Sequence, residues 1–286
     1  MSGGVHVIHT KTRAKKIRRI AVFVLLLGFV FVLDFPIIFM VLNSLKPNDE
    51  LLKTLTFLPD NWTFENYIAV FQKNNLMVYI KNSFFLTASS CLIAISASAL
   101  AGYVLSRYRH GAIQTYGSLL LMLQIFPMIL VLIPLFVFFT KLGMLDKHIS
   151  VILLYTAICV PYSTCMFRAY FDSIGKSLEE AAWIDGCTKF QAFVRIVIPL
   201  TWPGFIAVTI YCIILCWNEF MMANLFLRKS ELRTLPVVIR SFISSDSTNW
   251  AQMMATATIA FIPVFILFIF FQKYMIAGYT DGGTKE

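Results

Sequence analysis

Residues Asn82–Ser106 read NSFFLTASSCLIAISASALAGYVLS, an uninterrupted run without a charged side chain. About 20 apolar residues in an α-helix cross the hydrocarbon core of a bilayer. Lipid offers no hydrogen bonds to the backbone, so only helices and closed barrels span a membrane, and this run lacks the alternation of a barrel strand. The stretch therefore predicts a membrane-spanning helix. Its many small residues favour close packing against other helices.

The composition of the whole chain supports the same class of protein. The 286 residues are 58 % hydrophobic and 14 % charged, with a mean hydropathy of +0.75. Soluble domains are typically about 45–50 % apolar and about 25 % charged. A soluble fold could not cover so much apolar surface, and a disordered chain would be far more polar. We expect an integral membrane protein.

Six apolar segments are long enough to span the membrane, and two of them carry one acidic residue each. They predict an all-α, polytopic fold with six transmembrane helices, placed at Ile20–Leu45, Asn82–Ser106, Gly111–Thr140, Ile149–Phe167, Pro203–Leu227 and Ser247–Gln272. The chain then divides into a basic tail (1–19), a transmembrane domain (20–272) and a C-terminal tail (273–286).

The basic residues predict the orientation in the membrane. The net charge is +9, and six cations stand directly before the first apolar segment: Lys11, Arg13, Lys15, Lys16, Arg18 and Arg19. Lys and Arg accumulate on the cytoplasmic side, which favours a cytoplasmic N-terminus. Six spans return the C-terminus to the same side. No basic stripe with interleaved aromatics lies outside the spans, so we expect no nucleic-acid partner.

Nothing in the sequence predicts catalysis or metal binding by this chain. The run Gly175-Lys176-Ser177 invites a phosphate-loop interpretation, but Tyr170 stands where that motif needs glycine, and an apolar helix precedes it instead of a strand. The six cysteines form no CxxC pair and are expected to act as small buried hydrophobes. Four acidic residues of one loop, without a histidine, are better explained as solvated: Asp172, Glu179, Glu180 and Asp185.

That loop, about 172–202, carries the most specific pattern. Residues 177–204 read SLEEAAWIDGCTKFQAFVRIVIPLTWPG. Ala181 and Ala182 would let a short helix sit close to a partner, and Gly186 would end that helix as a left-handed C-cap. Glu180 and Asp185 would stay available for cations on another chain. Such a helix suits docking into a groove, although an ordinary solvated amphipathic loop is the alternative.

The pattern Glu180-Ala181-Ala182, then Asp185-Gly186, resembles the EAA loop of membrane subunits in binding-protein-dependent ABC importers. Further stretches are similar to the carbohydrate branch, specifically the smaller membrane subunit of maltose-type importers. They are Asn43-Ser44-Leu45-Lys46-Pro47, Asn82-Ser83, Trp217-Asn218-Glu219-Phe220 and the glycine-containing tail Ala277–Lys285.

The resemblance implies a type I permease fold and a set of partners. Such a subunit forms half of a translocation path with a second permease, which is usually a different chain. Two ATP-binding subunits grip the coupling helices, and an extracytoplasmic binding protein delivers a sugar or oligosaccharide. ATP and Mg would then be bound by the partner ATPase, with no cofactor on this chain. The implied location is the bacterial cytoplasmic (inner) membrane.

Two ionisable residues inside apolar spans are candidates for the substrate path, because such groups cost about 2.5–3.5 kcal/mol to insert. They are Asp34 and Glu219. Glu219 follows Trp217 and Asn218, so one turn offers a ring face and hydrogen-bonding groups that suit a sugar. The alternative is that Trp217 and Glu219 anchor the helix at the outer interface.

Other classes remain as rivals. The same architecture could import a polar solute that is not a sugar. A secondary carrier driven by ions would need buried ion-coordinating groups and inverted repeats, and neither stands out. A membrane-embedded enzyme would need a catalytic constellation, which is missing.

Overall fold

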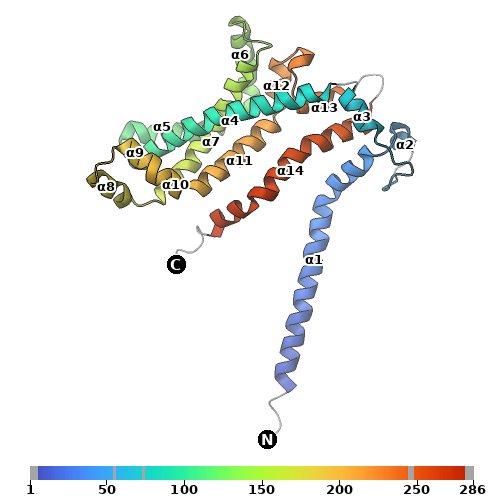
Figure 1. Cartoon of the computed structure of the whole chain (residues 1–286), viewed down its shortest axis with the longest axis horizontal. Helices are drawn as coiled ribbons and strands as arrows, with labels where there is room; N and C mark the ends of the chain where they lie inside the picture. Colours follow the sequence, from blue (N-terminus) through green and yellow to red (C-terminus); the bar gives the residue numbers. More distant parts are fainter. Residues whose placement is uncertain (1–5, 54–55, 73–74, 244–247, 281–286) are drawn as a thin grey trace.

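The computed structural model describes the backbone of residues 6–53, 56–72, 75–243 and 248–280, and the side chains of 15, 18–53, 56–72, 75–243 and 248–272. Within these residues the chain is helical, and its β-type pairing is limited to one isolated bridge between Ile243 and Thr248. The all-α expectation is confirmed (Figure 1).

Four long helices account for four of the predicted spans. They are α1 (His6–Ser44), α4 (Leu76–Arg107), α7 (His148–Asp172) and α14 (Trp250–Thr280), and each is long and apolar enough to cross a membrane. The helices extend beyond the apolar segments, because the flanking Lys, Arg and Gln residues are themselves good helix formers. Helical backbone therefore runs through both expected domain boundaries, at 19/20 and at 272/273.

The third predicted span is wrong as a single helix. It consists of α5 (Gly111–Leu123) and α6 (Met128–Lys141), which meet at an angle of 100°. Pro127 occupies the N-cap position of α6 with extended backbone. Proline disfavours helical backbone in the residue before it, so the helix stops ahead of Pro127 and restarts in a new direction.

The fifth predicted span is also broken. The helix α11 runs over Trp202–Trp217, stops at Asn218, and is followed by the short α12 (Met221–Phe226). Before it lie α9 (Lys189–Ala192), the π-helix η1 (Phe193–Val197) and α10 (Ile198–Leu200). The stretch from α9 to α10 makes an angle of 79° with α11. Taking each bent pair as one span gives six spans in the described chain.

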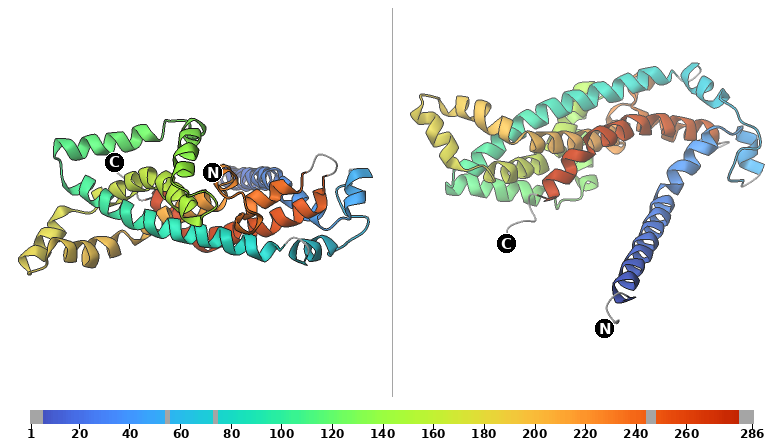
Figure 2. Two further views of the ribbon diagram at one scale, coloured as in Figure 1. Left: turned by 90° about the horizontal axis from the view of Figure 1, so that it is seen from above. Right: turned by 60° about the horizontal axis from the view of Figure 1, so that its bottom comes forward.

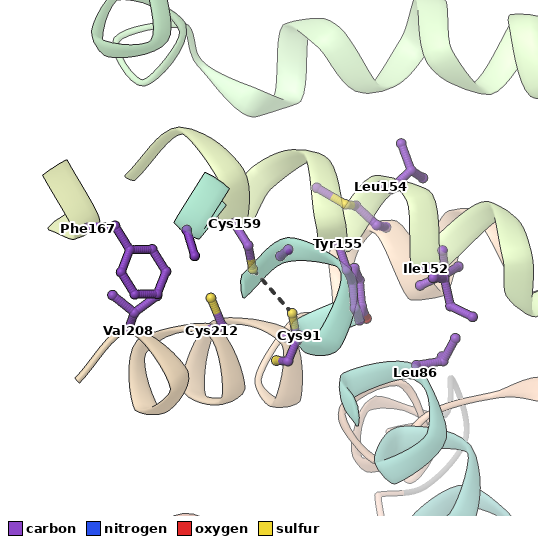
Figure 3. Packing of buried hydrophobic residues seen from close by; sticks show 14 of the residues in the cluster. Leu86, Cys91, Ile152, Leu154, Tyr155, Cys159, Phe167, Val208 and Cys212 are labelled. Atoms are coloured by element: carbon purple, nitrogen blue, oxygen red, sulfur yellow. Dashed lines mark hydrogen bonds between the residues drawn. The ribbon is translucent and has the colours of Figure 1, made fainter. Parts of the chain in front are cut away.

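The core lies where α4, α7 and α11 pack together (Figure 3). Its large buried side chains include Tyr155, Phe167 and Phe171 on α7. Cysteines from all three helices gather here, and the Sγ atoms of Cys159 and Cys216 are 3.5 Å apart. All six cysteines are free thiols; four of them are buried as expected, whereas Cys165 and Cys187 are half-buried.

Small residues of α4 bring it close to α7. A Cβ added to Gly102 would lie 2.7 Å from Cβ of Phe167. The hydroxyls of Ser90 and Ser98 donate across the contact to the carbonyl oxygens of Ile152 and Val160, each at 3.3 Å. Buried hydroxyls hydrogen-bonded between helices are typical of membrane helix interfaces, so the predicted close packing of this span is confirmed.

The connecting segments gather at opposite ends of the bundle (Figures 1 and 2). At one end lie α2 (Asn48–Lys53), α3 (Glu65–Gln72), the 3₁₀ turn η2 (Ser230–Leu232) and α13 (Leu235–Ser241). At the other lie α8 (Lys176–Ile184) and α9. The N-terminal part of α1 stands away from the bundle, and the end of α1 that leads to α2 lies beside α14 (Figure 1). The most apolar part of α1 is wholly unburied.

We predict that Gly102→Leu disrupts the bundle, because the new side chain would displace the backbone of α7. Overpacking of this kind costs about 1–3 kcal/mol even when side chains can relax. The control is Gly28→Leu on α1, where no atom lies within 4 Å of an added Cβ. The midpoint of thermal aggregation in detergent should fall for Gly102→Leu and stay unchanged for Gly28→Leu. Equal midpoints would contradict the close contact.

Candidate functional site

The predicted short helix in the loop of residues 172–202 is α8, which confirms that expectation. It begins after Gly175, directly beyond the end of α7. Glu180, Ala181 and Asp185 are exposed, whereas Ala182 is buried. The structure therefore gathers the five candidate docking residues, including Gly186, on one short element at the end of the bundle.

Gly186 ends α8 in the way the sequence predicted. Its φ is +87°, in the left-handed region that glycine adopts without strain. Its N–H donates to the carbonyl of Trp183 at 3.1 Å, and the N–H of Cys187 donates to that of Ala182 at 2.9 Å. These two bonds make a Schellman motif, which satisfies carbonyl groups at the helix end.

The free end of this loop presents apolar side chains to its surroundings. Ile184 is 87 % exposed and Phe190 is 66 % exposed, with Leu178 and Trp183 also exposed. Several large apolar side chains exposed on one loop are typical of a protein–protein contact surface. We call Leu178, Trp183, Ile184 and Phe190 the α8 patch; Glu180 and Asp185 belong to the same exposed element.

Glu179, the residue before the predicted motif, fixes α8 to the bundle. Its side chain is 1 % exposed, and its Oε1 accepts from Nε of Arg107 at 2.6 Å. The hydroxyl of Tyr103 donates to Oε2. A buried charge is tolerated only with a close partner and further hydrogen bonds, and both are present here. The pair joins α8 to the end of α4.

Arg107 ties a third element into the same cluster. Its Nη1 donates to the carbonyl of Phe171 at 3.0 Å and its Nη2 to that of Ile174 at 3.3 Å, both at the end of α7. The hydroxyl of Ser106 donates to Oδ1 of Asp172. The ends of α4 and α7 and the start of α8 are therefore held as one unit.

The sequence alone did not predict this anchor. Glu179 was expected to be a solvated acidic residue, and its burial in the structure corrects that expectation. A signal was available, because Glu179 lies three residues before Ala182 and therefore on the same face of the helix, and these are the two residues of α8 that are buried. The partner Arg107 could not be identified, since 72 residues separate it from Glu179.

Aromatic packing supports the second half of the loop. Phe193 is 4 % exposed, and the centroid of its ring lies 4.5 Å from the centroid of the Tyr103 ring. Thr188 and Gln191 form a capping box at the start of α9. Tyr103 thus contacts both Glu179 and Phe193, and so braces the segments before and after Gly186.

The structure does not gather the four candidate path residues. Trp217, Asn218 and Glu219 lie together at the end of α11, but Asp34 is exposed on α1. Trp217 is buried, and its Nε1 donates to the carbonyl of Ala260 on α14 at 2.9 Å. The predicted stacking face at Trp217 is therefore covered in this structure.

The carboxylate of Glu219 accepts from the backbone N–H groups of Met222 and Ala223 at 2.8 and 3.1 Å. These are orphan donors in the first turn of α12, where a negative charge is favourable. The hydroxyl of Tyr155 donates to the Glu219 carbonyl at 3.3 Å. Asn218 is the exposed member of the three. The segment is thus a brace between α7, α11, α12 and α14.

The side chain types that bind metals and the phosphate-loop-like run can both be placed among the described residues. No group of three or more His, Cys, Asp or Glu side chains there is arranged to hold a metal ion. The run Gly175-Lys176-Ser177 opens α8 after the helix α7, without a preceding strand.

Comparison with known proteins agrees with this architecture. Residues 94–280 match the family described as binding-protein-dependent transport system inner membrane component. The chain is 35 % identical to a sulfoquinovosyl glycerol transport system permease of Agrobacterium fabrum, over 95 % of this chain and 94 % of that protein. It is 31 % identical to a trehalose/maltose transport system permease of Thermococcus litoralis, over 96 % and 99 %.

Solved structures give the same result. A chain of a bacterial ABC transporter involved in the import of the acidic polysaccharide alginate superposes with a TM-score of 0.78 at 25 % identity, covering 92 % of this chain and 98 % of that one. A bacterial alginate ABC transporter in complex with an alginate pentasaccharide-bound periplasmic protein shares the fold, with a TM-score of 0.67 at 14 % identity. This chain therefore belongs to the inner membrane components of binding-protein-dependent transport systems, the permease subunits of ABC importers.

Proposed function

We propose that this permease forms half of the translocation path for a sugar or oligosaccharide. Several relatives are carbohydrate permeases by name, for sulfoquinovosyl glycerol, trehalose/maltose and arabinooligosaccharides, which supports a carbohydrate substrate. An extracytoplasmic binding protein delivers the substrate, and a second permease, in most such systems a different chain, completes the path. A polar solute that is not a sugar is the alternative substrate.

The observation that carries the proposal is the α8 patch on a helix anchored to the bundle. Apolar side chains on a short, capped helix suit a groove on a partner chain, which is a helix-in-groove contact. Glu180 and Asp185 offer carboxylates to cations of that partner. The partner is an ATP-binding subunit, and two such subunits serve the permease pair. ATP and Mg belong to those subunits, and this chain supplies no catalytic group.

The anchor explains how force would reach the membrane. Because Glu179 and Arg107 join α8 to α4 and α7, a movement of α8 carries the ends of both core helices with it. Closure of the ATP-binding subunits then moves the permease halves between inward-facing and outward-facing forms. The α8 end is cytoplasmic, with both chain termini on the same side of the bacterial inner membrane.

Asn218 is our candidate for a residue that lines the path. Its side chain is exposed at the end of α11, although Nδ2 already donates to the carbonyl of Ile214 at 2.9 Å. Trp217 and Glu219 act there through bracing. Asp34 could reach substrate only if α1 packs against the companion permease, since this chain leaves it uncovered.

The first test is isolation of the chain from its native membrane in mild detergent, followed by identification of the co-purifying proteins. Recovery of an ATP-binding subunit and a second permease, with uptake by proteoliposomes that requires internal ATP, would support the proposal. Screening the cognate binding protein against mono- and oligosaccharides then tests the substrate class. Full uptake by this chain alone in vesicles free of ATP would reject it in favour of an ion-driven carrier.

We predict that Glu180→Lys abolishes uptake while the protein remains in the membrane. The lysine would repel the cations that Glu180 meets on the ATP-binding subunit. Glu180→Gln serves as the control, because it keeps the side-chain length and hydrogen bonding and should retain part of the uptake. Membrane abundance by immunoblot and initial uptake rates provide the measurement. Normal uptake by Glu180→Lys would remove the docking role of this face.

Removal of one partner of the buried pair, by Glu179→Gln or Arg107→Met, should destabilise the cytoplasmic end by about 3–5 kcal/mol, because the other charge is left buried without its counterpart. We expect ATP hydrolysis in the complex to continue while substrate transported per ATP falls. The variant Arg107→Lys, which keeps a cation and donors beside Glu179, should retain part of the coupling. Wild-type coupling in both Glu179→Gln and Arg107→Met would show that the anchor does not transmit movement.

A further inference from the structure

A basic pocket lies beside the anchor, where the ends of α4 and α7 meet α5 and the start of α8. It has a volume of about 580 Å³, and four cations line it against one carboxylate. The charged residues are Arg107, Arg109, Arg168, Lys176 and Asp172. Once Glu179, the partner of Arg107, is counted with Asp172, four cations face two carboxylates, and a net charge of about +2 favours an anionic ligand.

Not all of this charge is already neutralised within the chain. Arg107 is committed to Glu179, and Arg168 shares Asp172 at 3.6 Å. Arg109 makes no ion pair with any residue the structure describes, and Lys176 reaches the carbonyl oxygen of Arg107 at 3.4 Å. Arg109 and Lys176, which both line the pocket, therefore keep donors for an incoming anion.

An apolar groove adjoins the pocket. It has a volume of about 390 Å³, lies between α4 and α5, and shares Leu105 with the basic pocket. Its other lining residues are apolar apart from the tyrosine hydroxyl: Leu100, Ala101, Val104, Ala112, Ile113 and Tyr116. A soluble anion would fill the basic pocket and leave the groove empty. An amphiphile could fill both, because it has a polar end and an apolar tail.

The location fits a lipid as well. The pocket is lined from the ends of α4 and α7 and from the start of α8, and the groove is lined by residues 100–105 of α4 and 112–116 of α5. Figure 1 shows that these helix ends lie on the same side of the bundle as α8. Basic pockets between helices at this level of a membrane bind anionic headgroups. We propose that an anionic phospholipid binds here, with its headgroup phosphate in the pocket between Arg109 and Lys176 and an acyl chain in the α4–α5 groove.

Such a lipid would lie against the ion pair that anchors α8. Its phosphate would accept hydrogen bonds from Arg109 and Lys176, while Arg107 stays paired with Glu179. The lipid would therefore link the segment after α4 to the start of α8 and hold the junction of α4, α7 and α8 more rigidly. The activity of the transporter should then depend on the fraction of anionic lipid. This inference concerns the chain itself and does not require that the substrate is a sugar.

The test uses native mass spectrometry of the purified transporter complex in detergent, supplied with palmitoyl-oleoyl phosphatidylglycerol or the matching phosphatidylcholine. The variant Arg109→Gln/Lys176→Gln should weaken retention of phosphatidylglycerol by about tenfold, since each cation near an anionic surface contributes several-fold to binding. The matched control is Lys141→Gln/Arg195→Gln, which removes the same charge from exposed positions outside the pocket.

A second variant separates a lipid from a free anion. Val104→Trp places a large side chain at the groove, where Val104 is 40 % exposed and has room to accept it. It should reduce retention of the long-chain lipid and leave binding of dihexanoyl phosphatidylglycerol unchanged. Retention that survives both variants overturns the site. Equal competition by inorganic phosphate and indifference to Val104→Trp would show a free-anion pocket and would also overturn the proposal.

Discussion

The close approach of α4 and α7 determines the geometry of the rest of the molecule. Gly102 leaves no space for a side chain against Phe167, and the serines of α4 donate into the backbone of α7 along the contact. In a bilayer, packing of this kind replaces the hydrophobic effect as the force between helices. It brings Ser106 and Arg107 to the end of α7, where they meet Asp172 and the carbonyl groups of Phe171 and Ile174.

The buried Glu179–Arg107 ion pair connects that junction to α8. A buried ion pair contributes little net stability, but its geometry is demanding, because either charge alone would be costly. The pair therefore specifies where α8 sits and does so with little freedom. An apolar patch on so rigidly held a helix can transmit displacement to the core helices, which an ordinary flexible loop could not.

The break in the fifth span also depends on specific contacts, here between side chains and unpaired backbone groups. The stop of α11 at Asn218 leaves backbone groups without helical partners, and side chains near the break supply some of them. Glu219 caps α12, Trp217 binds the backbone of α14, and Tyr155 binds the carbonyl of Glu219. Irregular backbone at this depth is tolerated only where protein or water satisfies it.

The sequence by itself determined the membrane class, the approximate positions of the spans and the α8 element, because hydropathy, glycine at position 186 and the alanines beside Glu180 act over a few residues. It predicted the left-handed cap at Gly186 correctly for the same reason. Tertiary structure decided the rest. Only the fold shows that Glu179 is buried while Glu180 is exposed, that Trp217 is covered, and that Asp34 stands apart. The burial of Glu179 depends on Arg107, and the burial of Trp217 depends on the carbonyl of Ala260; both partners lie far along the chain. Local sequence does not show which distant group will neutralise a charge or accept a hydrogen bond from a ring nitrogen.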